Sequence, residues 1–364
     1  MKEQVLKFSV VLFLILSTKS IHAQKNITNL AGYEVAIDSI NEFLKSRMDS
    51  LNIPGLSIAV INEGKVVYHK TFGYANLEKK LPVTHKTIFE GASISKSVFA
   101  FFVMKFVEEG KLDLDKPLYE YLPYNDIAYD DRYKKITARM VLSHRSGFPN
   151  WRENEEDKKL KIKFNPGTGY EYSGEGYQYL AMVLKHIDKT DWKGLEALFQ
   201  EKIAQPLEMG NTTFIPTPTI YKNKAEPYTN QREWIDLKND YWYKKELGKF
   251  IAPSSIHTEP IDFSKWMIGV MQKKILSKNS YKELFKHHSK ISTSSTGINV
   301  YYTLGFLTAD QDYSQTYFHN GNNAGFTCGY LMDVEKDWGF VLFTNSEYGE
   351  KLTDEVWNYF EQEN

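Results

Sequence analysis

The sequence predicts an α/β protein of the α+β type, in which an antiparallel sheet from both chain ends is flanked by helices and carries an inserted, mainly helical region. Two observations support this prediction. β-rich runs around turns occur near each end of the chain, at residues 54–68 and 329–343. Between them the pattern is mostly helical, with Pro and Gly marking the breaks. The length of 364 residues allows one large domain or two, and we assign residues 24–364 to one.

Residues 1–23 have the features of a secretory signal peptide. Lys2 and Lys7 make the start basic, residues 8–16 form an apolar run, and Ala23 ends a cleavage site of the required type. The run is far shorter than the ~20 residues that cross a bilayer. An uncleaved membrane anchor is the alternative. We therefore expect an exported protein, periplasmic or secreted, with no stable membrane span after signal removal.

The first elements of the mature chain are a helix and a hairpin. Residues 35–48 carry apolar side chains at helical spacing, which predicts a helix. Residues 54–61 and 65–68 are β-rich runs on either side of Asn62-Glu63-Gly64, which predicts two paired strands. These elements would supply one part of the sheet.

The remaining predicted elements are a central helix and a closing pair of strands. Residues 97–109 are apolar nearly all round, so this helix should be buried, and Gly110 ends it. Residues 329–332 and 339–343 predict a second strand pair. A terminal helix over residues 352–360 follows them.

Composition excludes several function classes. Lys and Arg total 45 and Asp and Glu total 46, so the chain lacks the basic excess expected of a nucleic-acid binder. Cys328 is the single cysteine, which excludes an intramolecular disulfide and a thiolate zinc cluster. The adjacent His287 and His288 cannot face one ligand from a helix, and no phosphate-binding loop motif occurs. The sequence therefore predicts no metal, no cofactor and no nucleic-acid partner.

One motif predicts nucleophilic chemistry. Ser93-Ile94-Ser95-Lys96 has the form S-x-x-K and stands at the start of the predicted buried helix, where positions three apart share a face. A desolvated lysine loses its preference for the charged form and can take the proton that keeps a serine hydroxyl unreactive. The bland alternative is a serine that caps a core helix while Lys96 extends to solvent.

Several segments, in order along the chain, resemble the serine β-lactamase and penicillin-binding-protein superfamily, closest to its class C β-lactamase, DD-peptidase and esterase branch. The resemblance implies a β-lactamase/DD-peptidase-like fold. The segments that carry it span most of the mature chain: residues 53–74, 87–96, 109–123, 136–149, 166–177, 205–214, 302–306 and 319–326.

The resemblance also implies roles for individual residues. Ser93 matches the acylated nucleophile, Lys96 its partner amine and Tyr172 the tyrosine that shares proton transfer with the lysine. A phenol titrates near pH 10, so a nearby positive charge from Lys96 would be needed to lower the pKa of Tyr172. The amide of Asn322, with that of Ser93, would hold the oxyanion.

The third motif, His319-Asn320-Gly321, resembles the His-x-Gly form found in esterase- and peptidase-like relatives. Gly321 would let the strand approach the substrate closely. His319 would orient the substrate or tune the lysine–tyrosine pair. The alternative for His319 is a purely structural histidine.

Two departures from the family pattern bear on function. Gly174 stands where the second motif usually has Asn, and His319 stands where β-lactamases usually have a lysine that helps bind a substrate carboxylate. Both weaken the case for efficient β-lactam hydrolysis.

The sequence thus predicts an exported serine hydrolase with a Ser93 acyl-enzyme, acting on small-molecule or peptide substrates that are amides or esters. The alternatives are a β-lactamase proper, or a non-catalytic penicillin- or cell-wall-binding sensor of the same fold. Residues 227–246 are polar and aromatic, and we expect either a loop over the cleft or surface packing of aromatic side chains.

Overall fold

The computed structural model describes residues 25–239, 243–244, 247–294, 297–310 and 315–362. Residues 1–23, for which a signal peptide is predicted, lie outside the described residues, so the division at residue 23 stays a prediction. The strands are β1 (Asn26–Thr28), β2 (Glu34–Ala36), β3 (Gly55–Asn62), β4 (Lys65–Asn76), β5 (Leu81–Pro82), β6 (Phe89–Glu90), β7 (His257–Thr258), β8 (Ser289–Thr293), β9 (Asn299–Tyr302), β10 (Leu307–Ala309), β11 (Thr316–Asn323), β12 (Phe326–Asp333) and β13 (Trp338–Thr344).

Most of the helices come between β6 and β8 in the sequence. They are α1 (Ile37–Ser50), α2 (Ser95–Glu108), α3 (Ala138–Leu142), α4 (Gly174–Ile187), α5 (Trp192–Phe199), α6 (Pro218–Asn223), α8 (Pro260–Met271), α9 (Lys278–Leu284) and α10 (Gly349–Glu361). None of the helices in the described part of the chain combines the length and apolar character needed to cross a membrane.

The main sheet has nine strands in the order β5-β4-β3-β13-β12-β11-β10-β9-β8, and every neighbouring pair is antiparallel. Strand β13 pairs directly with β3, with Val341 opposite Ala59. The predicted sheet from both chain ends is therefore confirmed, because β3 of the first strand pair and β13 of the second are neighbours in it.

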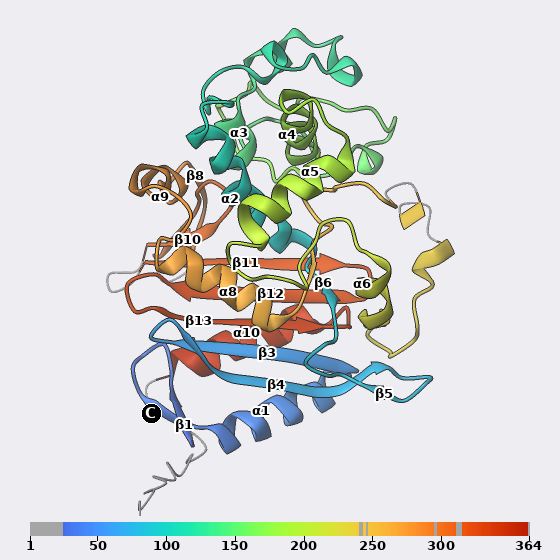
Figure 1. The fold of residues 1–364 in the computed structure, drawn as a ribbon, viewed down its shortest axis with the longest axis vertical. Coiled ribbons are helices and arrows are strands. Elements are labelled where there is room, and N and C mark those ends of the chain that lie inside the picture. Colours follow the sequence, from blue (N-terminus) through green and yellow to red (C-terminus); the bar gives the residue numbers. More distant parts are fainter. Residues whose placement is uncertain (1–24, 240–242, 245–246, 295–296, 311–314, 363–364) are drawn as a thin grey trace, which may run out of the picture.

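The alternation of side chains along β3 gives the sheet two covered faces. Leu56, Ile58 and Val60 pack with α1 and α10 on one face. Ala59 and Ile61 belong to the larger core on the other face, where α8 lies against the strands. Figure 1 shows α8 in front of the strands and α10 behind them.

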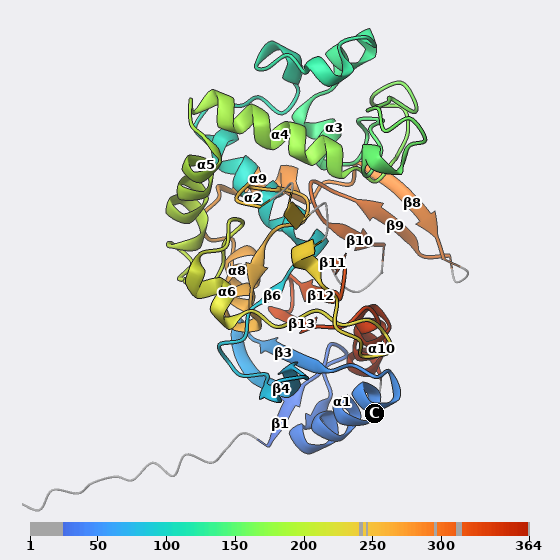
Figure 2. The same cartoon turned by 90° about the vertical axis from the view of Figure 1, so that its right-hand side faces the viewer.

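Helix α2 connects the sheet to the helical region that contains α3, α4 and α5 (Figures 1 and 2). Its residues from Ser95 through Met104 are all buried, as its apolar composition predicts. The helix ends at Glu108 with Glu109 as its C-cap, and Gly110 has a φ of 66°, a left-handed conformation that favours glycine. The N-terminal end of α2 therefore lies where the sheet meets the helical region.

The sequence misses part of the sheet. The region between the terminal strand pairs was expected to be helical or loop-like, but it contributes β8, β9 and β10 to the main sheet. Strand β8 has the sequence Ser289-Lys290-Ile291-Ser292-Thr293 and is half exposed. Because most of these residues are polar, the sequence alone favours a loop. The predicted helix over residues 35–48 is also shifted, because Val35 lies in β2 and the helix begins at Ile37.

Candidate active site

Ser93 lies in a tight turn between strand β6 and helix α2. The turn is a 3-10 segment over Ala92–Ile94, and α2 begins at Ser95, so Ser93 precedes the helix rather than standing in it. Ala92 has a φ of 42°, a left-handed conformation that costs energy for any residue with a side chain. Gly91 donates from its backbone to the Ile256 carbonyl at 2.7 Å. The turn thus holds a partly exposed hydroxyl in a fixed and strained position.

Lys96 is the amine next to this hydroxyl. Its Nζ lies 3.1 Å from Ser93 Oγ and donates to the Pro253 carbonyl at 3.0 Å. The side chain is 1% exposed. Burial lowers the pKa of Lys96 to about 7, because the charged form loses its hydration. A substantial fraction of Lys96 is therefore neutral near pH 7 and able to accept the Ser93 proton.

Tyr172 is the third member of this cluster. Its hydroxyl is hydrogen-bonded to Ser93, and its ring centroid lies 4.5 Å from Lys96 Nζ. Desolvation raises the pKa of Tyr172 well above its ordinary value, and the bond to Ser93 offsets this only in part. The charge needed to lower the pKa of Tyr172 is therefore not supplied by Lys96. Tyr172 is a neutral phenol at pH 7 that can pass on a proton but cannot act as a phenolate base.

His144 holds the segment that carries Tyr172. Its Nδ1 accepts a hydrogen bond from the Ser173 backbone N–H at 3.0 Å, and its ring lies 4.3 Å from the Tyr172 ring. Ser173 in turn caps α4 by accepting from the Gly176 N–H at 2.9 Å. His144 has a φ of 57°, as expected of a residue that organises a turn. Sequence reasoning missed the contact of His144 with Tyr172.

Strand β11 lies against the Ser93 turn. Strand β10 pairs with it only at Tyr317 and Phe318, so the following residues are open on that side, and the turn contacts them. A Cβ added to Gly321 would lie 3.0 Å from Ser93 N and 2.6 Å from the Gly91 carbonyl oxygen. Only glycine allows this approach. Asn322 follows it and is exposed.

His319 lies in the same strand, and its side chain is buried rather than exposed to solvent. Its Nδ1 lies 2.6 Å from the Asn320 carbonyl, so it carries the proton, and its Nε2 accepts from the Tyr302 hydroxyl at 2.9 Å. Burial, with a further contribution from Lys96, lowers the pKa of His319 to about 3. The ring is therefore neutral with both nitrogens bonded, which suits a role in positioning or tuning better than direct substrate contact.

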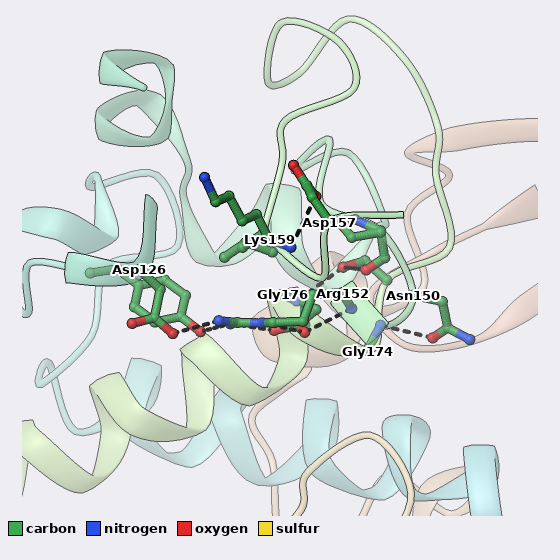
Figure 3. A network of polar contacts seen from close by, with 12 residues as sticks. Asp126, Asn150, Arg152, Asp157, Lys159, Gly174 and Gly176 are labelled. Atoms are coloured by element: carbon green, nitrogen blue, oxygen red, sulfur yellow. Dashed lines mark hydrogen bonds and ion pairs between the residues drawn. The ribbon is translucent and has the colours of Figure 1, made fainter. Parts of the chain in front are cut away.

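Gly174 makes room for a neighbouring loop. Its N–H donates to Asn150 Oδ1 at 3.0 Å, and a Cβ at this position would lie 2.9 Å from the Asn150 carbonyl oxygen and 3.1 Å from the Trp151 ring. Arg152 then anchors the loop through two bonds of 2.8 Å to the Glu175 carboxylate (Figure 3). The space next to Gly174 that a side chain would take is thus occupied by the loop that carries Trp151.

A pocket of about 420 Å³ opens beside the Ser93 turn. Its wall is tied to the turn because the Ser95 hydroxyl accepts from the Ile256 N–H at 3.0 Å. The lining residues are Glu90, Trp151, Asn154, Phe214, Pro216, Tyr221, Leu237, Tyr243, Leu247, Gly248, Lys249, Ile251, Ser254, Ser255, His257, Asn323 and Ala324. Leu237 and Tyr243 belong to the predicted cleft loop over residues 227–246, whereas Tyr241 and Trp242 of that loop lie outside the described residues.

The structure thus brings Ser93, Lys96, Tyr172 and Gly321 together, with Asn322 next along β11 and exposed, and with His319 buried earlier in the same strand. Sequence reasoning missed the contacts of Tyr302, Trp151 and Pro253. Among the described residues, no group of three or more His, Cys, Asp or Glu side chains is placed to hold a metal ion.

The family model described as Beta-lactamase matches residues 40–362. A protein named flp from Staphylococcus aureus (strain MW2) is 25% identical over 338 residues, which cover 87% of this chain and 65% of that protein. The chain thus spans about 65% of the length of this relative.

Two further matches differ in extent. The mitochondrial serine beta-lactamase-like protein LACTB of Mus musculus is 34% identical over 143 residues, 38% of this chain and 26% of that protein. The solved structure of an octameric penicillin-binding protein homologue from Pyrococcus abyssi superposes with a TM-score of 0.73 at 23% identity, over 86% of this chain and 74% of that one. The latter shows that the fold is shared.

Proposed function

The chain belongs to the beta-lactamase family, and from that premise we propose that it is an exported serine hydrolase that forms an acyl-enzyme on Ser93 and cleaves small amides or esters. The observation that carries the proposal is the 3.1 Å separation between Ser93 Oγ and a buried Lys96 amine whose pKa is about 7. Burying a lysine costs stability because desolvation penalises its charge, and a chemical role explains why Lys96 is buried.

The proposed reaction begins with proton transfer. Neutral Lys96 accepts the Ser93 proton as Oγ attacks the substrate carbonyl carbon. The backbone amides of Ser93 and Asn322 would stabilise the resulting oxyanion. This assignment is supported by the close approach of Gly321 to Ser93 N.

The intermediate then collapses and the leaving group departs. The leaving group takes its proton from the Lys96 ammonium, directly or through the Tyr172 hydroxyl, which is hydrogen-bonded to Ser93. Water next attacks the acyl carbon with Lys96 again as the base, and Ser93 regains its proton as the acid product leaves. No step in this cycle needs a metal or cofactor.

The test is covalent labelling of the purified protein. A fluorophosphonate or a labelled penicillin should form an adduct on the peptide that contains Ser93, mapped by mass spectrometry. Ser93→Ala should abolish the adduct and lower turnover by roughly 10³-fold or more. Ser50→Ala, an exposed serine on α1, is the matched control. Labelling that survives Ser93→Ala would refute the proposal.

A β-lactamase proper is the less favoured reading within this chemistry. The third-motif lysine that helps bind a carboxylate in such enzymes is replaced by His319, which is neutral and fully bonded. Gly174 also lacks the side chain of the second motif. A measurable nitrocefin rate that disappears in Ser93→Ala would favour the β-lactamase; ligand-induced stabilisation without any turnover would favour a sensor.

Export is proposed on the basic and apolar pattern of residues 1–23. Fractionation of the producing cells, followed by N-terminal sequencing, should find the protein outside the cytoplasm beginning at residue 24. A full-length N-terminus on the exported protein would support the uncleaved anchor instead.

A further inference from the structure

Two histidine side chains face each other near the edge of the main sheet that β4 and β5 form (Figure 1). His69 lies in β4 and His85 in the segment between β5 and β6, 16 positions further on, so no short motif marks them. Their Nδ1 atoms are 3.2 Å apart, and their ring centroids are 4.5 Å apart. Neither residue belongs to the Ser93 cluster or lines the pocket beside it, so the proposed reaction does not explain this pair.

The strand fixes the position of His69. The residue pairs with Ala59 of β3, and the alternation along β4 places its flanking residues Tyr68 and Lys70 on the opposite face. Its Nε2 lies 3.5 Å from the hydroxyl of Ser57, which is buried. When Nε2 carries the proton and donates it to Ser57, the lone pair of Nδ1 is free on the side of His85. Metal-ligating histidines are oriented by a second hydrogen bond of this kind.

A tight turn holds His85. The Thr84 N–H donates to Thr87 Oγ1 at 2.9 Å, and the Thr87 N–H donates to the Thr84 carbonyl at 3.0 Å. The Val83 N–H donates to the carbonyl of Gly73 in β4 at 3.0 Å, which ties the turn to the strand. His85 itself is exposed, so an ion and its water molecules can reach the ring. The backbone therefore positions both imidazoles before any ligand arrives, which reduces the cost of binding one.

The separation of the two nitrogen atoms fits two ligands of one metal ion. Zinc binds imidazole nitrogen at about 2.0–2.1 Å, so two nitrogens at a tetrahedral angle around it lie about 3.3 Å apart. The Nδ1 atoms of His69 and His85 are 3.2 Å apart. Imidazole also suits nickel and copper. A hydrogen bond from one ring to the other would give a similar distance, and it is the explanation that the experiment below must exclude.

The surroundings of the pair restrict the kind of ion that it suits. Within the described part of the chain, no third His, Cys, Asp or Glu side chain joins His69 and His85 in a metal-binding group. The other coordination positions would thus be taken by water, unlike those of a closed structural zinc site. Calcium and magnesium prefer oxygen ligands, so two imidazoles do not suit them. Lys86 is exposed and can extend its charge into solvent, away from the ion.

We infer that His69 and His85 form a binding site for a divalent transition-metal ion of the zinc, nickel and copper group, held through both Nδ1 atoms and completed by water. The bound ion would clamp the turn over residues 84–87 to β4. That turn leads through β6 to the Ser93 turn, so the ion would stabilise the segment that precedes the proposed nucleophile. The site takes no part in the proposed reaction, and the inference does not depend on that reaction.

The test is calorimetric titration of the purified protein, freed of any histidine tag, with NiCl₂ and with ZnCl₂. It is run at about pH 7.5, where a histidine of ordinary pKa is mostly neutral. We expect roughly one ion to bind per chain, and saturating Ni²⁺ to raise the melting temperature by at least about 2 °C, because the ion binds only the folded pair. MgCl₂ should give neither binding heat nor stabilisation.

Three variants assign the binding to the pair. His85→Gln removes one ligand at an exposed position, so the fold is kept, and the affinity for Ni²⁺ should fall at least roughly tenfold with loss of the stabilisation. His69→Gln should have the same effect. His186→Gln, at an exposed histidine on α4, is the matched control and should change neither value. Electron paramagnetic resonance of bound Cu²⁺ should show coupling to two imidazole nitrogens in the wild type and to fewer in His85→Gln.

The outcomes decide between a metal site and a pair joined by a hydrogen bond only. If neither Ni²⁺ nor Zn²⁺ binds, or if both bind equally well to the wild type and to His85→Gln, the inference is overturned. Loss of binding in His186→Gln would place the ion elsewhere and overturns it too. Labelling of Ser93 should be the same in His85→Gln and the wild type, so failure of the metal site and failure of the hydrolase proposal are separate results.

Discussion

The cluster around Ser93 and the pocket wall beside it are built in opposite ways. The wall formed by Ser93, Lys96 and Tyr172 is polar, and Ser93 is hydrogen-bonded to both of the other side chains. The pocket wall with Phe214 and Ile251 is apolar, and loops far apart in the sequence assemble it. The first wall is suited to moving protons and the second to removing hydrophobic surface from water. Chemistry and selectivity should therefore be separable by substitution.

The largest effect is expected at Lys96. Replacing it with Met removes the base while keeping the length of the buried side chain, and kcat/KM should fall about 10³-fold on every ester. Lys96→Arg should fall just as far, because a guanidinium is charged at all working pH values and cannot accept the Ser93 proton. Steady-state kinetics on p-nitrophenyl acetate and p-nitrophenyl phenylacetate check this prediction.

Retention of activity in Lys96→Arg alone would show that the positive charge, rather than the base, is what the reaction uses. Melting temperatures of both variants provide the control for folding.

The pH dependence is the next largest effect. Lys96 must be neutral to accept a proton, and its pKa is about 7, so kcat/KM should rise with pH through about 7 and level off above it. Between the plateau and pH 5 the loss should be about 100-fold, the same for both esters. A profile that falls as pH rises from 6 to 8 would contradict the assignment of Lys96 as the base.

A smaller effect is expected at His144, which positions Tyr172 without touching substrate. His144→Asn keeps a residue type that accepts left-handed backbone, but it removes the ring that contacts Tyr172. We expect kcat to fall roughly tenfold with little change in KM, because the phenol is displaced from Ser93. Stopped-flow or steady-state assays measure the split. A change confined to KM would place His144 in substrate binding instead.

The smallest effect is expected at Lys249 in the pocket wall. For neutral esters Lys249→Gln should change kcat/KM less than about threefold, since a partly exposed charge contributes little to binding an uncharged group. A much larger loss, or a loss seen only with the p-nitrophenyl half-ester of succinic acid, which carries a carboxylate, would mean that the pocket recognises an anion and that the two walls are not divided as described.

The chemical wall could be predicted because it depends on local spacing. Ser93 and Lys96 are three residues apart at the start of a buried helix, and Gly321 lies in a short motif. The paired terminal strands were also predictable, since β-branched runs around turns are local patterns. Their union at β3 and β13 followed from placing both pairs in one sheet.

The remainder depends on contacts that no short pattern encodes. The raised pKa of Tyr172 could not be predicted, because it comes mainly from desolvation, and burial is a tertiary property. The reason for Gly174 appears only when the loop with Trp151 is seen against it. Strand β8 was missed because its polar sequence gains strand structure from pairing with β9.

The pairing of β13 with β3 constrains how the chain can be made. Ala59 of β3 pairs with Val341 of β13, so this part of the sheet joins residues that lie far apart in the sequence. A nascent chain therefore cannot join the two strands until β13 has been synthesised, and contacts of such long range form slowly. Chains cut short before β13 would leave β3 as an unpaired edge, a template for aggregation.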